Sequence, residues 1–128
     1  MIYADTSALA KLLIAEAETP ALRDWIAGQD GRLVTNSVGV VELRRLAARV
    51  SQQAVGAATV LLGRIDRLAL TPAALALAGE LPPPEVRTLD ALHIASAAEL
   101  LDLQVLLTYD HRMVEAATQY GLPVESPR

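Results

Sequence analysis

The chain begins with a short apolar run that ends in an acid, and this feature constrains its fold most. Met1–Ala4 favours a β-strand, and Asp5 ends it. Thr6 or Ser7 can then cap a helix, since a hydroxyl oxygen accepts from amides that have no partner in the first turn. Ala8–Ala17 continues as helix-forming sequence. Because α/β folds bind ligands at the carboxyl edge of the sheet, we interpret Asp5 as the first member of a carboxylate cluster.

Length and composition predict one folded domain over residues 1–128. The chain is 52% hydrophobic and long enough to bury a core. It has no cysteine, which excludes disulfides and thiolate metal sites. No apolar run approaches the ~20 residues that span a bilayer, and no basic segment precedes an apolar stretch as in a signal peptide. We therefore expect a soluble, cytoplasmic protein.

The charge balance argues against a general nucleic-acid coat protein, because the net charge is −4. Asp5, Glu42, Asp90 and Asp110 alone contribute a charge of −4, and the charges of the remaining residues sum to zero. Lys11 is the only lysine among eleven basic residues. Nucleotide-binding P-loops and receiver domains need lysines at particular places, which this chain does not offer.

Turn residues and apolar periodicity divide the rest of the chain into alternating helices and strands. Helices are expected at 19–27, 37–50, 51–66, 72–79, 89–103 and 112–120, and strands at 32–36, 68–71, 105–108 and 122–125. Ser37, Ser51 and Thr88 are the expected caps, and Gly121 closes the last helix. This alternation predicts a parallel sheet that helices cover on both faces.

Four acids stand where predicted strands end or predicted helices begin. Asp5 and Asp110 end strands, whereas Glu42 and Asp90 lie early on the helices 37–50 and 89–103. Each has a simpler structural interpretation. Asp5 and Asp110 can be helix caps, Asp90 can favour the positive end of a helix dipole, and Glu42 can pair with Arg45 one turn on.

The surroundings favour a cluster of these acids. The helix 89–103 is apolar almost all round, which predicts burial, so Asp90 at its start needs a partner. Glu42 lies beside an apolar stripe on its own helix. Converging carboxylates stay ionised at neutral pH only when a cation neutralises them. Oxygen ligands without cysteine select Mg²⁺ or Mn²⁺.

A hard divalent ion at such a site suits phosphodiester hydrolysis. It activates a water as nucleophile and neutralises the charge that builds on the phosphoryl oxygens. Ser7 can orient that water or the substrate, or it can simply cap a helix. Thr108 can do the same near Asp110, although a core threonine is the simpler interpretation.

Three motifs carry a resemblance to a known family. They are Tyr3-Ala4-Asp5-Thr6-Ser7-Ala8-Leu9, Arg87-Thr88-Leu89-Asp90-Ala91-Leu92-His93 and Thr108-Tyr109-Asp110-His111-Arg112-Met113, together with Glu42 on the third helix. With these motifs the chain resembles the PIN-domain ribonucleases, in particular the VapC toxins of bacterial toxin–antitoxin pairs. The resemblance spans nearly the whole chain, and the second and third motifs in combination are the specific ones.

The resemblance implies an α/β/α sandwich with a central parallel sheet and Mg²⁺- or Mn²⁺-dependent endonucleolytic cleavage of RNA. It also implies a cognate VapB antitoxin, which inserts a peptide, and in many pairs an arginine, into the acidic cleft. In the family the four catalytic acids correspond to Asp5, Glu42, Asp90 and Asp110. Asp5, Asp90 and Asp110 correspond to metal ligands, and Glu42 lies near the metal or acts through water.

RNA binding is expected from residues that flank the acids in sequence. The substrate-binding candidates are Ser7, Arg87 and Arg112, and the wider basic rim adds Lys11, Arg44, Arg45 and Arg49. His93 is expected to be a hydrogen-bonding core residue rather than a general acid or base. Few aromatic residues argue against extensive base stacking. An apolar surface over Val55–Leu62 suggests a homodimer.

Three alternatives stay open. The first is a PIN-fold protein-binding module with a non-catalytic site. The second is an aspartyl-phosphate phosphatase, which usually needs an acid two residues after the first and a nearby lysine. Ser7 holds that second position here. The third is a DNA 5′-nuclease, for which the chain is too short to build the usual helical clamp.

Overall fold

A five-stranded parallel sheet forms the centre of the structure, a computed structural model that describes residues 1–128. Its strands are β1 (Ile2–Ala4), β2 (Leu33–Asn36), β3 (Asp66–Leu68), β4 (Val105–Leu107) and β5 (Val124–Glu125). Their order in the sheet is β3-β2-β1-β4-β5, and every neighbouring pair is parallel. The prediction of a parallel sheet is therefore confirmed.

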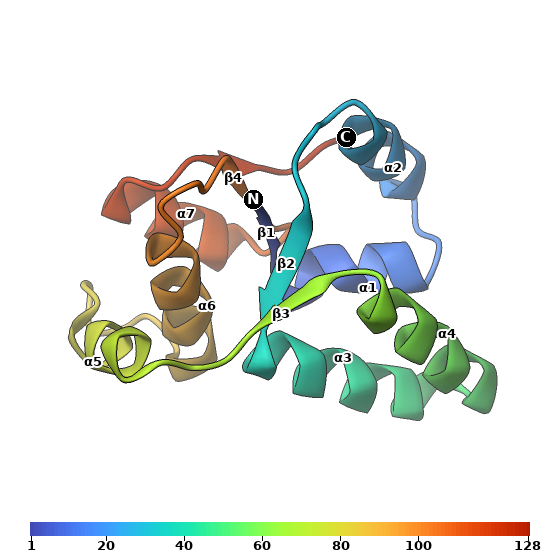
Figure 1. Ribbon diagram of the computed structural model, residues 1–128, viewed down its shortest axis with the longest axis horizontal. Coiled ribbons are helices and arrows are strands. Elements are labelled where there is room, and N and C mark those ends of the chain that lie inside the picture. Colours follow the sequence, from blue (N-terminus) through green and yellow to red (C-terminus); the bar gives the residue numbers. More distant parts are fainter.

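Seven helices cover the two faces of this sheet (Figure 1). They are α1 (Thr6–Leu13), α2 (Thr19–Ala27), α3 (Ser37–Val50), α4 (Gln52–Gly63), α5 (Pro72–Glu80), α6 (Thr88–Ala98) and α7 (His111–Tyr120). Helices α1 to α4 pack on one face, and α5 to α7 pack on the other. The fold is thus the expected α/β/α sandwich.

Alternating side chains of the central strands build a separate core on each face. Ile2 and Ala4 of β1 join the cluster under α1 to α4, whereas Tyr3 between them joins the cluster under α5 to α7. Leu106 and Leu107 of β4 divide in the same way. This alternation follows from the two-residue period of a strand, and it requires both faces to be covered.

Three helices, α1, α3 and α6, begin one residue earlier than the hydroxyl caps predict, and α6 has Arg87 as its cap residue without a side-chain hydrogen bond. The strand-ending Asp5 and Asn36 are themselves the caps of α1 and α3, and their side chains accept from the amides of Ala8 and Gly39. Both cap residues keep extended backbone, so their side-chain oxygens reach the amide three positions on. The acid that ends β1 therefore also starts α1.

Several boundaries differ from the sequence-based expectation. Helix α1 ends at Leu13 because Ile14 adopts extended backbone, and α4 ends at Gly63 before β3 begins. Helix α6 ends at Ala98 rather than at position 103, and β3 begins two residues earlier than predicted. The apolar composition of these stretches does not fix where a helix ends, and Leu101 beyond α6 is fully exposed. No helix has both the length and the apolar character needed to cross a membrane.

The sheet order creates a crevice at the carboxyl ends of β1 and β4. These two strands are neighbours, and the chain leaves β1 toward β2 on one side and β4 toward β5 on the other. Asp5 follows β1 and Asp110 lies three residues beyond the end of β4. Ligands of open α/β sheets bind where the strand order reverses in this manner.

Candidate active site

All four predicted acids line one hollow at this crevice. The hollow has a volume of about 320 Å³, and Asp5, Glu42, Asp90 and Asp110 all contribute to its wall. Asp5 follows β1, Glu42 lies on α3, Asp90 lies in the first turn of α6, and Asp110 caps α7. Four separate elements thus bring acids that are far apart in the sequence to one place.

Asp5 is the most deeply buried of the four acids, at 3% exposure. Its Oδ1 accepts from the Ala8 amide at 3.0 Å and from the Ser7 hydroxyl at 2.6 Å. Its Oδ2 accepts from the Thr108 hydroxyl at 2.5 Å. Burial raises the pKa of the Asp5 carboxyl, and these three hydrogen bonds counter only part of that rise.

Ser7 and Thr108 join the two strand ends to each other. The Ser7 Oγ accepts from the Tyr109 amide at 2.8 Å, and the Thr108 Oγ1 accepts from the Asp110 amide at 3.2 Å. The same two hydroxyls donate to Asp5. Ser7 therefore fixes the position of an acid and of the loop after β4, beyond the capping role that its sequence position suggests.

Glu42 takes part in a buried chain of hydrogen bonds rather than in a surface pair with Arg45. Its Oε1 accepts from the Thr6 hydroxyl at 2.7 Å and lies 2.7 Å from the His93 Nε2. Because a carboxylate only accepts, the His93 Nε2 carries the proton, and the Tyr3 hydroxyl, 2.8 Å from Nδ1, donates to that nitrogen in the neutral imidazole. Burial favours the neutral acid, yet the bonds from His93 and Thr6 outweigh it and lower the pKa of Glu42.

Gly39 and Asn36 bring α3 close enough to α6 for this contact. A Cβ at Gly39 would lie 2.2 Å from the Thr35 Oγ1 and 3.3 Å from the His93 Cε1, so only glycine fits there. The Asn36 amide donates to the Ser96 hydroxyl of α6 at 2.9 Å, while its oxygen caps α3. Glu42 stands three residues after Gly39, on the same side of α3.

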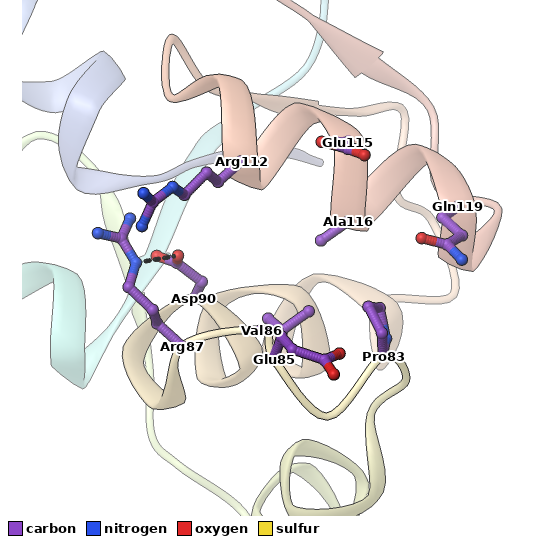
Figure 2. Close-up of a pocket in the computed structure, with 9 residues that line it drawn as sticks. All are labelled: Pro83, Glu85, Val86, Arg87, Asp90, Arg112, Glu115, Ala116 and Gln119. Atoms are coloured by element: carbon purple, nitrogen blue, oxygen red, sulfur yellow. Dashed lines mark hydrogen bonds and ion pairs between the residues drawn. The ribbon is translucent and has the colours of Figure 1, made fainter.

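Arg87 holds the other two acids together. Its Nε donates to the Asp90 Oδ2 at 3.0 Å, and its Nη2 donates to the Asp110 Oδ2 at 2.9 Å. The Arg87 side chain is 54% exposed, whereas Asp90 is 15% and Asp110 is 33% exposed. Figure 2 shows the pair of Arg87 and Asp90 with Arg112 beside it. The guanidinium therefore supplies the positive charge at the outer half of the hollow.

The remaining basic residues lie in different surroundings. Arg112 is exposed, and its side chain extends toward Arg87 in Figure 2. Lys11 pairs with Glu16 at 2.7 Å and with Glu18 at 2.9 Å, so acids of its own segment already neutralise it. Arg45 and Arg49 line a different hollow. Among the six basic residues named from sequence, only Arg87 lines the hollow of the acids.

The donors around the hollow fit a hard divalent cation. Four carboxylates and three hydroxyl residues line it, and the chain contains no sulfur donor from cysteine. As the side chains stand, no three acids or histidines are gathered closely enough to hold a metal ion. Arg87 instead bridges two of the candidate ligands. A cation bound here would compete with this double ion pair for the same carboxylates.

Sequence reasoning missed the partners that hold Glu42. Tyr3 and Thr6 both belong to the first motif. The Thr6 hydroxyl donates to Glu42 directly, whereas the Tyr3 hydroxyl bonds to His93, which in turn bonds to Glu42. A tyrosine in an otherwise apolar strand was the available signal, because a buried hydroxyl needs a hydrogen-bond partner. The prediction of His93 as a hydrogen-bonding core residue agrees with its 2% exposure and its two contacts.

Comparison with known proteins identifies relatives over the whole chain. The family model described as PIN domain matches residues 2–119. Ribonuclease VapC47 of Mycobacterium tuberculosis is 42% identical over 99% of this chain and 97% of its own length. Ribonuclease VapC35 of the same species is 38% identical, with the same coverage of both chains.

Solved structures share the fold at lower identity. Mycobacterium tuberculosis VapC20, described as a sarcin-ricin loop cleaving toxin, has a TM-score of 0.77 and 20% identity, and each chain is covered completely. VapBC-1 from nontypeable Haemophilus influenzae has a TM-score of 0.76 and 19% identity, with 98% of each chain covered. These similarities extend along the chain and are not confined to the acidic motifs.

Proposed function

The chain belongs to the PIN-domain family, and on this premise we propose that it is the toxin of a type II toxin–antitoxin pair that cleaves RNA as a metal-dependent endoribonuclease. The VapC ribonucleases that are 38% to 42% identical over nearly its full length support the nuclease activity. The VapBC complexes that share its fold support the toxin–antitoxin context. An RNA substrate implies action in the cytoplasm.

One observation carries the proposal, namely the four carboxylates that line a single hollow at the switch point of the sheet. Acids used only as helix caps or surface charges have no reason to converge there. Their mutual repulsion is costly unless cations are present, and Arg87 neutralises only the outer pair. Asp5 and Glu42 form no ion pair with Arg87 and are held instead by hydroxyl donors and, at Glu42, by the His93 imidazole.

Asp5, Asp90 and Asp110 are the proposed ligands of Mg²⁺ or Mn²⁺, and Glu42 is the fourth catalytic acid. When bound, such a cation activates a water for attack on the phosphodiester and offsets the charge on the phosphoryl oxygens. Hydroxyl and amide donors already fix the Asp5 carboxylate, so this ligand needs no rearrangement. His93 and Thr6 hold the Glu42 carboxylate toward the hollow from the side of α3.

Arg87 and Arg112 are the proposed contacts to the RNA backbone, and Ser7 orients the reacting groups next to Asp5. The Arg87 side chain is about half exposed, so its guanidinium can turn toward solvent when a cation replaces it at the two acids. The freed guanidinium then lies at the rim of the hollow, where it can bind a phosphate oxygen. Arg87 thus pairs with Asp90 and Asp110 before the cation binds and contacts the RNA backbone afterwards.

A VapB-type antitoxin is the proposed protein partner. A second hollow of about 550 Å³ shares Thr6, Glu42 and Leu89 with the acidic one. Its other walls are mostly apolar and carry two arginines: Val38, Val41, Leu46, Leu70, Arg45 and Arg49. A peptide with apolar and acidic side chains can fill this groove and reach the catalytic acids. Exposed Val55 and Val60 on α4 support the proposed homodimer.

The decisive experiment is cleavage of RNA by the purified chain, stripped of metal and then supplied with Mg²⁺ or Mn²⁺. We expect cleavage only with metal, and no cleavage by Asp5→Asn or Asp90→Asn at any metal concentration. Mapping of RNA ends in cells after brief induction, with Asp5→Asn as control, then identifies the target. A chain that binds a partner protein but cleaves no RNA even after Mg²⁺ or Mn²⁺ has been supplied would instead support the protein-binding module.

A further inference from the structure

A third hollow opens beside the one that the acids line, and the reaction proposed above leaves it free. Its volume is about 360 Å³, which falls within the range of roughly 300 to 1,000 Å³ typical of small-ligand sites. Arg87 and Asp90 line both hollows, so the two are neighbours. Whatever binds in this third hollow therefore lies next to the group that is cleaved.

One helix face and the proline-containing connector form the walls of this hollow. The contributions of α7 are Arg112, Glu115, Ala116 and Gln119, whose spacing of three, four and seven residues defines a single face. The facing wall is Pro83, Glu85 and Val86, immediately before α6 (Figure 2). Pro83, Val86 and Ala116 are its apolar residues, and the other lining residues are polar or charged.

The polar side chains divide the hollow into a basic end and an acidic end. Figure 2 shows Arg87 and Arg112 together at the end next to Asp90, and Gln119 at the opposite end. Glu85 and Glu115 stand on facing walls away from the arginines. Arg112, Glu115 and Gln119 are exposed and make no side-chain hydrogen bond within the chain, so they are available to a ligand.

We propose that this hollow, the flanking-base pocket, holds the base of the nucleotide next to the scissile phosphate and favours bases with an exocyclic amino group. The inference rests on the proposed function, because the scissile phosphate must lie in the acidic hollow for the next base to reach the pocket. The basic end attracts the adjoining phosphate. Val86, Ala116 and Pro83 supply the apolar surface against which the base packs, and the Arg87 or Arg112 guanidinium can stack on a splayed base.

The two glutamates give the pocket its preference. Their carboxylates repel a phosphate, which excludes the backbone from this end, but they accept hydrogen bonds from amino groups. Adenine, cytosine and guanine each present an amino group, whereas uracil has no amino group and its single N3–H lies between two carbonyl oxygens that face the carboxylates unfavourably. Gln119 can donate and accept, so it tolerates every base. Uridine is therefore the nucleotide that the pocket disfavours.

Short single-stranded RNAs that differ only in the bases next to the cleaved bond test this proposal. Cleavage by the wild-type chain and binding by Asp5→Asn are both measured. On one side of the bond, adenine, cytosine and guanine should be favoured over uracil by about tenfold, as expected for one hydrogen bond to a charged group. The variants Glu85→Gln and Glu115→Gln, alone and together, should lose that preference, because an amide also donates to uracil.

Glu80→Gln is the matched control, since it removes the same charge from the exposed end of α5, outside the pocket. It should keep the wild-type preference. Equal cleavage of all four RNAs, or an unchanged preference in the double glutamine variant, overturns the pocket and leaves the proposed function standing. Base-dependent binding without any cleavage by the wild type keeps the pocket and overturns the nuclease. Absence of both overturns both.

Discussion

The two halves of the acidic hollow hold their carboxylates in opposite ways. Asp5 in the inner half is buried and accepts three hydrogen bonds from neutral donors. Asp90 and Asp110 in the outer half are partly exposed, and a charged guanidinium joins them. The inner half is fixed in position while its charge stays uncompensated. The outer half is compensated by a group that can leave.

This difference assigns separate tasks to the two halves. Neutral donors orient a carboxylate without neutralising it, which is why burial still raises the pKa of Asp5. A cation that enters the hollow therefore finds one ligand ready and must displace Arg87 to obtain the others. The predictions below disrupt one half at a time, from the largest expected effect to the smallest.

Asp5→Asn should abolish most activity while leaving the fold at least as stable. The loss in cleavage rate should be roughly 10²-fold to 10³-fold or more, as for removal of a preorganised electrostatic group. Thermal unfolding should show an unchanged or higher Tm, because asparagine keeps an oxygen for the Ala8 amide and removes a buried charge. Asp5→Ala is the control. It loses the cap as well and should cost about 1 kcal/mol.

The stability gain of Asp5→Asn should depend on pH in a defined direction. The folded chain raises the pKa of Asp5 above the ordinary value of 3.8, so the folded state binds the proton more tightly than the unfolded state does. Wild-type stability therefore falls as the pH rises from near that ordinary value through the folded pKa. Asp5→Asn should be more stable than the wild type at neutral pH, and this difference in stability should disappear in acid. A constant difference across pH would contradict the buried charge.

His93→Ala should reduce both stability and activity by removing the support of Glu42. The Tyr3 hydroxyl and the Glu42 carboxylate each lose a partner, which should lower the free energy of unfolding by about 2 to 3 kcal/mol. Misplacement of Glu42 should slow cleavage by roughly tenfold. Tyr3→Phe, measured beside it, removes only the remote hydroxyl and should cost about 1 kcal/mol. Wild-type kinetics in His93→Ala would show that cleavage does not depend on the support of Glu42 by His93.

Arg87→Gln should affect metal and RNA in opposite directions. Loss of the competing cation at Asp90 and Asp110 should tighten Mn²⁺ binding several-fold. Loss of a phosphate contact should weaken RNA binding and reduce the salt slope of log K by about 1. Arg23→Gln removes an exposed charge from α2, far from the acids in the sequence, and should change neither quantity. Weaker Mn²⁺ binding in Arg87→Gln would refute the competition.

Lys11→Gln should have the smallest effect on RNA binding, although Lys11 is the only lysine. Its ammonium group already pairs with Glu16 and Glu18 and lies 4.9 Å from the centre of the Tyr109 ring. Affinity for RNA should change by less than about twofold, since such a paired charge adds little to a distant phosphate. A loss comparable to that of Arg87→Gln would mean that Lys11 leaves its partners to bind RNA.

Most of the fold could be predicted from the sequence because strands and helices alternate with clear signals. The parallel sheet, Gly121 as the left-handed residue after α7 and the cap at Ser51 all follow from local patterns. The ends of the helices were harder to predict from the sequence. The stretch after Ala98 stays rich in leucine although α6 has ended and Leu101 is fully exposed, so apolar composition fixes neither the helix end nor burial there.

The acids could be chosen from the sequence, but their partners could not. Capping and clustering turn out to be compatible, since Asp5 and Asp110 cap helices and line the hollow at once. The bridge from Arg87 to Asp110 joins positions 23 residues apart, and no local pattern encodes it. The same holds for Glu42 and His93, which meet only because Gly39 lets α3 approach α6.

Mn²⁺ binding, followed by the electron paramagnetic resonance signal of the free ion, tests most directly whether the two halves form one site. The wild-type chain should bind Mn²⁺, and Asp5→Asn and Asp90→Asn should each lose that binding, although they lie in different halves. If either variant, still folded, bound Mn²⁺ with wild-type affinity, the inner and outer carboxylates would not share a cation.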